Sequence, residues 1–254
     1  MEEKILPFQI SLIKENKQDK NTSQFIIEGL YPGYGTTLGS ALRRVLLSSL
    51  EGSAITQVKI KGVSHEFSTI SGVKEDVLEI LLNLKQVRLN INGDLPQTLE
   101  IQEKGPSRGE KVITAGDIKT PPQVKIVNPE LPLLTLTSPR AKIDIEMQAQ
   151  RGYGYVPAET FKSGKGEIGV LYLDASFGPI KKVGFRVEDM RVGKTIDFNR
   201  LIIDITTDGT IKPNEALTQS CEILISYFQK IKDSVEKLNS EKEKVSPKKK
   251  KSKK

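Results

Sequence analysis

The stretch that most constrains this fold covers residues 33–50 and has the apolar spacing of an amphipathic helix. Pro32 and two glycines mark a loop before it, and a hydroxyl of Thr36 or Thr37 is expected to cap the first free backbone amides. At 100° per residue, one side of the helix is predicted to be a core face. That side carries Leu38, Ala41, Leu42, Val45 and Leu46.

The opposite side of this helix is polar except for one leucine. Arg43 and Arg44 lie there, with Leu47 between them. An isolated exposed leucine is common in folded proteins. Arginine beside an aliphatic side chain is also the usual composition of a binding hot spot. Helical angles by themselves leave both interpretations open.

A second long helix is predicted near the carboxyl end, with Pro213 in its first turn. Its apolar residues alternate at spacings of four and three, as in the seam of a coiled coil. They are Leu217, Cys221, Leu224, Phe228, Ile231, Val235 and Leu238. The seam either packs on its own domain or continues into a partner. We favour a partner, because Ile223, Ile225 and Tyr227 add apolar surface beside the seam.

The remaining chain is predicted to be mainly strands and turns, which gives an α+β fold. Two strands precede the first helix, another covers residues 58–63 and continues through His65 to Phe67, and Asn92-Gly93 closes a hairpin. The spacing predicts a short helix over residues 76–85. Alternation over residues 141–150 predicts a strand with one face in water.

Composition excludes several classes of protein. The net charge is +7, but residues 248–254 contain six lysines, which leaves +1 on the rest of the chain. A basic tail is not a shaped nucleic-acid groove. One cysteine and one histidine exclude a disulfide framework and a His/Cys metal cluster. No signal peptide and no apolar run of ~20 residues is present, so we expect a soluble cytosolic protein.

Four segments together resemble a known family. They are LGSALRRVLLSS (38–49), VKEDVLEILLNLK (73–85), QRGYGYVPA (150–158) and TDGTI (207–211). In this order they are similar to the amino-terminal assembly domain of the α subunit of bacterial-type RNA polymerases, which bacteria and plastids contain. The resemblance covers roughly residues 5–235.

The resemblance implies a particular domain organisation. Residues 1–51 and 176–238 would form one discontinuous dimerisation domain, an antiparallel sheet with two major helices. Residues 52–175 would form an inserted, strand-rich domain. Residues 239–254, rich in Glu, Lys, Ser and Pro, are expected to be a disordered tail.

The resemblance also implies partners and contact residues. Family members form a homodimer through the first and last helices of this domain, and then bind the polymerase subunits β and β′. The implied dimer residues are Leu38, Leu42, Leu46, Leu217, Cys221, Leu224, Phe228 and Ile231. The β contact centres on Arg44, with Leu47 and Arg43 beside it. Lys85 and Leu173 match positions of β′ contact, although Lys85 also suits a helix C-terminus.

No catalytic site is expected on this chain. Nucleotide addition needs clustered carboxylates that hold Mg²⁺, and the acidic residues here are scattered. We therefore expect no cofactor on this subunit, Mg²⁺ in the active site on β and β′, and contact with DNA through the assembled enzyme. The location would be the cytoplasm and nucleoid of a bacterium, or the stroma of a plastid, with no membrane association.

The carboxyl end departs from the family. Typical members continue into a helical domain that binds promoter DNA, and no room is left for it in this sequence. Either the natural protein lacks this domain or the sequence is a truncated form of it. The run Lys248, Lys249, Lys250 and Lys251 either contacts DNA through phosphate charge or only solubilises the chain. The alternative function is a free-standing homodimer of the same fold that binds nucleic acid through this tail.

Overall fold

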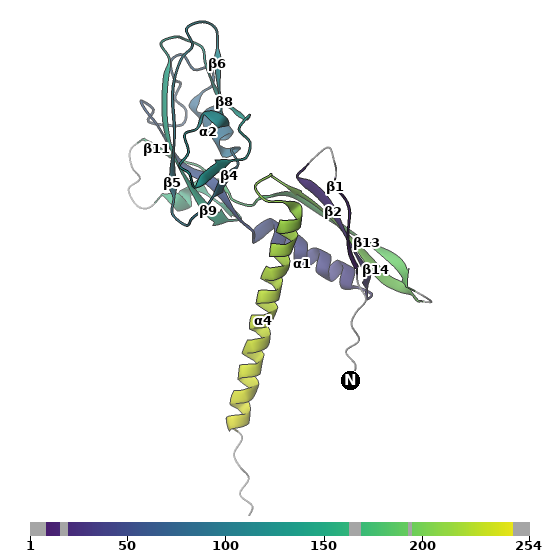
Figure 1. Ribbon diagram of the computed structural model, residues 1–254. Helices are drawn as coiled ribbons and strands as arrows, with labels where there is room; N and C mark the ends of the chain where they lie inside the picture. The colour runs from purple at the N-terminus through teal and green to yellow at the C-terminus, as the bar shows by residue number, and fades with distance from the viewer. Residues whose placement is uncertain (1–8, 16–19, 163–168, 193–194, 246–254) are drawn as a thin grey trace, which may run out of the picture.

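The computed structural model describes residues 9–15, 20–162, 169–192 and 195–245. These residues form two bodies with separate apolar cores (Figure 1). The terminal body has its core in residues 25–50 and 183–217, from both ends of the chain. The insert body has its core in residues 55–173. The boundaries near residues 51 and 175 stay a prediction.

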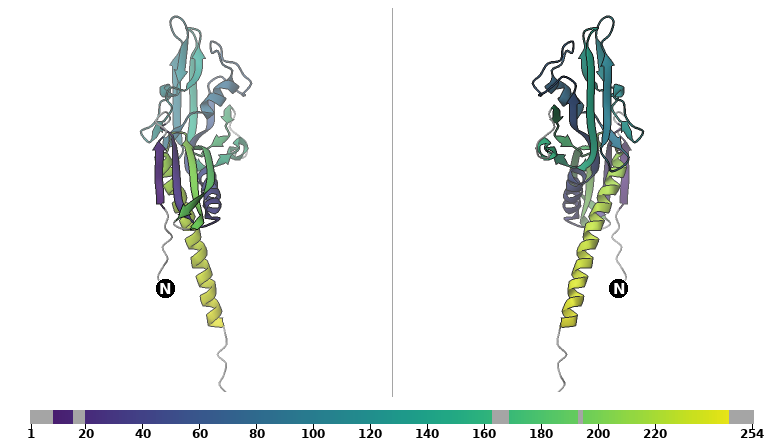
Figure 2. Two further views of the ribbon diagram at one scale, coloured as in Figure 1. Left: turned by 90° about the vertical axis from the view of Figure 1, so that its right-hand side faces the viewer. Right: turned by 90° about the vertical axis from the view of Figure 1, so that its left-hand side faces the viewer.

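The terminal body is an antiparallel sheet covered by helices. Its strand order is β1 (Gln9–Glu15), β2 (Thr22–Leu30), β14 (Thr195–Thr207) and β13 (Ile180–Val192). The central pair joins distant segments, with Phe25 opposite Ile203. Figure 2 shows the four strands side by side, which confirms an α+β arrangement with antiparallel sheets.

Helix α1 (Tyr34–Ser48) packs on β13 and β14 of this sheet. Its predicted core face is confirmed at Leu42 and Leu46, which are buried. The predicted cap is wrong: Gly33 occupies the N-cap position with φ +84°, and no side chain caps the helix. Glycine adopts this left-handed backbone without steric cost, so the chain turns at Gly33. The helix then begins at Tyr34, before either threonine.

The insert body contains a second four-stranded antiparallel sheet. Its order is β11 (Val170–Tyr172), β3 (Glu51–Ile60), β9 (Lys142–Tyr153) and β5 (Gln97–Lys104). Helix α2 (Val77–Lys85) packs against β8 and β3, and Asp76 caps it by accepting the Glu79 N–H at 2.7 Å. The remaining elements are β4 (Leu89–Ile91), β6 (Lys111–Thr114), η1 (Ala115–Asp117), β7 (Val124–Ile126), β8 (Pro132–Leu136), β10 (Tyr155–Val156), α3 (Ala158–Phe161) and β12 (Ala175–Ser176).

Two strand predictions in this body need correction. The Asn92-Gly93 turn does not close a hairpin, because β4 pairs with β7 and β5 pairs with β9. Residues 65–67 are loop, not a continuation of β3. The alternation of β9 is confirmed, since Ile143, Ile145 and Met147 are buried while the residues between them are at least partly exposed.

Helix α4 (Pro213–Val245) starts in the predicted place and then leaves the terminal body (Figures 1 and 2). Its first turns pack on the core through Ala216, Leu217 and Ser220. The prediction of a disordered tail from residue 239 is wrong for residues 239–245, which continue the helix. Continuous hydrogen bonding along a helix favours extension beyond the last packed turn. Residues 246–254 lie outside the described chain.

Candidate interaction surfaces

The outward side of α1 carries two arginines and a leucine. Arg43 and Arg44 are exposed, and Leu47 keeps 42% of its surface in contact with solvent. Within the described ranges, neither guanidinium has a carboxylate at ion-pair distance. A guanidinium presents up to five donors in a planar fork that suits carboxylates and carbonyls. This surface therefore has charge and apolar area available for a partner.

An apolar groove lies between α1, β2 and α4. It has a volume of about 430 Å³. Its lining is almost entirely carbon: Ile27, Gly29, Leu30, Tyr31, Tyr34, Leu38, Leu42, Cys221, Leu224, Ile225 and Phe228. Burial raises the pKa of the Cys221 thiol, with a smaller contribution from Glu222, so this cysteine is a neutral part of the lining.

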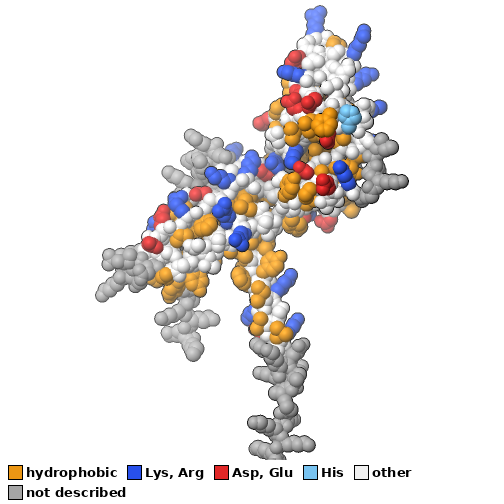
Figure 3. Space-filling model, turned by 180° about the vertical axis from the view of Figure 1, so that it is seen from behind, with side chains coloured by type: hydrophobic (Ala, Val, Ile, Leu, Met, Phe, Trp, Pro, Cys, Tyr) orange, Lys and Arg blue, Asp and Glu red, His pale blue; other side chains and the backbone are white. Residues whose placement is uncertain are grey.

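The apolar seam of α4 continues beyond the groove into solvent. Phe228 is 66% exposed, and the next seam residues are also uncovered: Ile231, Val235 and Leu238. Hydrophobic side chains line this part of the helix in Figure 3. Exposed apolar stripes of this kind mark interaction sites. No helix among the described residues is both long and apolar enough to cross a membrane.

The residues predicted for the dimer interface divide into two groups. Leu46 has no exposed surface, and Leu42 and Leu217 are also in the core of the terminal body. Leu46 therefore leaves no surface of its own for a partner in this structure, because a periodic face does not show how deep each residue lies. Leu42 also reaches the lining of the groove, and the remaining predicted residues hold surface or groove positions: Leu38, Cys221, Leu224, Phe228 and Ile231.

Lys85 belongs to a small polar cluster on the insert body. Its Nζ lies 3.3 Å from Oδ2 of Asp174 and 5.9 Å from the ring centre of Tyr155. The backbone N–H of Ala158 donates to Asp174 at 3.0 Å. This bond, the Tyr155 hydroxyl and Lys85 hold the pKa of the Asp174 carboxyl below its usual value. The same carboxylate raises the pKa of Tyr155.

Leu173, the second residue predicted for β′ contact, lies mostly in the core of the insert body. It is 7% exposed, and its N–H donates to the Thr56 carbonyl at 2.9 Å. This burial contradicts a direct contact through the Leu173 side chain. The strand pattern could not reveal it, because β11 is only three residues long.

Sequence reasoning missed Asp174, Tyr155 and the two tyrosines of the groove. Tyr31 and Tyr34 flank the Pro32-Gly33 loop, and aromatic residues beside a helix start are the signal that was available. Among the described residues, no three His, Cys, Asp or Glu side chains gather as a metal site. The lysines 248–251 lie outside the described residues.

Known proteins resemble the chain over most of its length. The model of the family described as "RNA polymerase Rpb3/RpoA insert domain" matches residues 58–178. Three similar proteins are each named DNA-directed RNA polymerase subunit alpha. The one from Carboxydothermus hydrogenoformans is 45% identical over 85% of this chain and 68% of its own length. Those from Roseiflexus sp. and Hydrogenobaculum sp. are 49% and 44% identical, over 84% and 90% of this chain. The chain spans 64% and 69% of their lengths.

Proposed function

Because the chain belongs to the family of DNA-directed RNA polymerase α subunits, we propose that it is a homodimeric scaffold on which β and β′ assemble. The observation that carries this proposal is the apolar groove between α1 and α4, together with the uncovered seam of α4. Family membership does not favour the alternative of a free-standing nucleic-acid-binding dimer.

In the proposed dimer, the α4 seam of each protomer covers the groove of the other. A twofold interface uses the same surface on both copies, so one groove and one seam per chain are sufficient. Phe228 is at the centre of this arrangement, because it lines the groove and also belongs to the exposed seam.

The outward side of α1 would then remain free for β. It carries Arg43, Arg44 and Leu47, and none of them lines the groove. Lys85, held beside Asp174 on the insert body, is proposed to contact β′. Because the dimer presents two copies of each surface, unlike partners would use the same surfaces on different protomers.

We propose that this subunit supplies no catalytic group. In the assembled polymerase, Mg²⁺ would be held by carboxylates of β and β′, and DNA would be contacted through the whole enzyme. The relatives come from bacteria, which supports a cytoplasmic location.

Light scattering tests the proposal directly. We expect the purified chain to have the mass of a dimer, and to form a complex of two chains with one β after mixing with β from the same organism. A monomer that does not bind β would overturn the proposal. A dimer that does not bind β would support the homodimer and contradict the role as a scaffold for β.

A further inference from the structure

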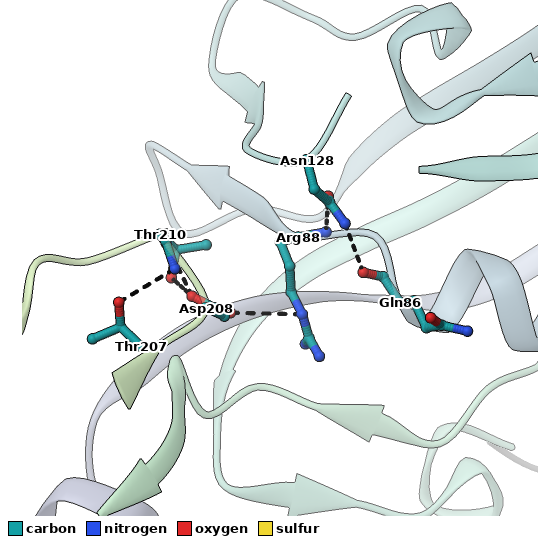
Figure 4. A network of polar contacts seen from close by, with 7 residues as sticks. Gln86, Arg88, Asn128, Thr207, Asp208 and Thr210 are labelled. Carbon is teal, nitrogen blue, oxygen red and sulfur yellow. Dashed lines mark hydrogen bonds and ion pairs between the residues drawn. The ribbon is translucent and has the colours of Figure 1, made fainter. Parts of the chain in front are cut away.

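One charged pair joins the two bodies. The turn after β14 places Asp208 against the segment between α2 and β4, which carries Arg88 (Figure 4). The Arg88 Nε lies 3.8 Å from Oδ2 of Asp208. The arginine side chain is 26% exposed and the aspartate side chain only 5%. A pair this buried is weakly screened by solvent and salt.

The Asp208 end of the pair is held rigidly by the terminal body. Its Oδ1 accepts the backbone N–H of Thr210 at 2.9 Å and the Thr210 hydroxyl at 2.6 Å. Its own N–H donates to the Pro179 carbonyl at 2.9 Å. One carboxylate oxygen therefore fixes the turn, and the other is directed at Arg88.

The Arg88 end is held equally well by the insert body. The Arg88 N–H donates to Oδ1 of Asn128 at 2.8 Å, and the Asn128 amide donates to the Gln86 carbonyl at 3.0 Å. The Val127 N–H donates to the Arg88 carbonyl at 2.9 Å. Both partners thus lie on backbone that has little freedom to adjust.

The two bodies also approach closely here. A Cβ atom on Gly209 would lie 3.1 Å from Cγ1 of Val127, and Gly209 has φ +97°. Beside this contact, the bodies separate around a polar cleft of about 460 Å³. Its lining includes Glu51, Asn90, Arg151, Thr210, Glu215 and Gln219. The bodies therefore meet beside a polar cleft and also through a small apolar cluster of Ala54, Ala175 and Phe177. Interfaces between domains permit relative motion unless they are large and hydrophobic.

We infer that Arg88 and Asp208 are a positioning pair that fixes the orientation of the insert body on the terminal body. Removing Arg88 leaves a buried carboxylate without its counter-charge, which a rotation of the bodies would relieve by admitting water. This pair also sets the spacing between Arg44 on one body and Lys85 on the other. That consequence for partner binding rests on the proposed function.

Electron–electron double resonance between two spin labels measures this orientation. The labels are placed at Glu66 and Lys182, one exposed position on each body, in a Cys221→Ala background. Mixing with excess unlabelled chain keeps labelled protomers apart in any dimer. The variants are Arg88→Gln, Asp208→Asn and the double change. Asp208→Asn keeps an oxygen for Thr210, and it replaces the oxygen that faces Arg88 with an NH2 group, so the charge and that acceptor are both removed.

We expect a wider or shifted distance distribution in both single variants. The distribution of the double variant should be no wider than that of the more affected single variant. Arg200→Gln is the matched control, because Arg200 pairs with Glu28 at 2.7 Å inside one sheet. The distance distribution of this variant should match that of the parent. Unchanged distributions in both single variants, or effects that add in the double variant, would overturn the inference. If Arg88→Gln does not fold, Asp208→Asn and the double variant decide.

A binding assay then examines the consequence for assembly. The Arg88→Gln dimer should bind β as the parent does, and should recruit β′ less well to the preformed complex. If the parent itself does not bind β, the proposed function fails, while the distance measurement still decides the role of the pair.

Discussion

Gly39 of α1 lies directly against Phe185 of β13. A Cβ atom added to Gly39 would be 2.6 Å from Cδ2 of Phe185 and 2.9 Å from Cδ1 of Leu201. The helix therefore rests on the sheet with no space for a side chain at this position. The contact also sets how the outward side of α1, with its two arginines, stands on the terminal body.

We predict that Gly39→Ala destabilises the protein, although alanine is the better helix former. Overpacking typically costs about 1–3 kcal/mol, which exceeds the ~1 kcal/mol gained in helix propensity. Urea unfolding followed by circular dichroism, at one fixed protein concentration, measures the difference. Thr36→Ala on the exposed side of α1 is the control and should stay within about 0.5 kcal/mol. An unchanged midpoint for Gly39→Ala would contradict this packing.

Phe228→Asp is predicted to dissociate the proposed dimer. The change places a charge in an apolar groove, and a central aromatic residue commonly contributes about 2 kcal/mol or more to an interface. That corresponds to a dissociation constant of the dimer that is roughly thirty times larger. Light scattering over a dilution series measures it. Ser226→Asp adds the same charge about 200° around the helix and should leave the mass unchanged; equal effects of the two changes would argue against the seam.

Arg44→Ala is predicted to abolish co-purification with β while the chain stays dimeric. The side chain is exposed and makes no ion pair with described residues, so stability should change by less than about 0.5 kcal/mol. Arg44→Lys should restore binding only in part, because lysine lacks the planar fork. Arg140→Ala, an exposed arginine of the insert body, is the control. Full binding by Arg44→Ala would remove this residue from the β contact.

The lowered pKa of Asp174 predicts that the stability of the folded chain depends on pH under acidic conditions. Its pKa is below the ordinary 3.8 in the folded chain, first because of the Ala158 N–H, then the Tyr155 hydroxyl and Lys85. Between the two pKa values the unfolded chain binds more protons, so stability rises with pH there. The stability difference between the parent and Asp174→Asn should be constant above pH 3.8 and should shrink as the pH falls through the lowered pKa.

Unfolding series at several pH values, together with an NMR titration of the Asp174 carboxyl carbon, check this prediction. A carboxyl group that titrates at or above 3.8 would show that the cluster around Lys85 does not form in solution.

Local patterns in the sequence determined the positions of the main helices and of one long strand. The spacing of apolar residues located α1, α2 and the start of α4, and the Asp76 side chain was suited to cap α2. Alternation located β9 and its wet face. These features depend on helix and strand periods and on capping chemistry, which act within a few residues of one another.

Only the tertiary structure decided which segments pair and what covers each face. Asn92-Gly93 has the composition of a hairpin turn, yet β4 and β5 pair with distant strands. Periodicity put Leu46 and Phe228 on apolar faces alike, but the first is fully buried in the core of the terminal body, whereas the second keeps 66% of its surface exposed. The contact between Arg88 and Asp208 joins residues 120 positions apart. A sequence period shows which side of an element is apolar, whereas its neighbour is set by the packing of the whole chain.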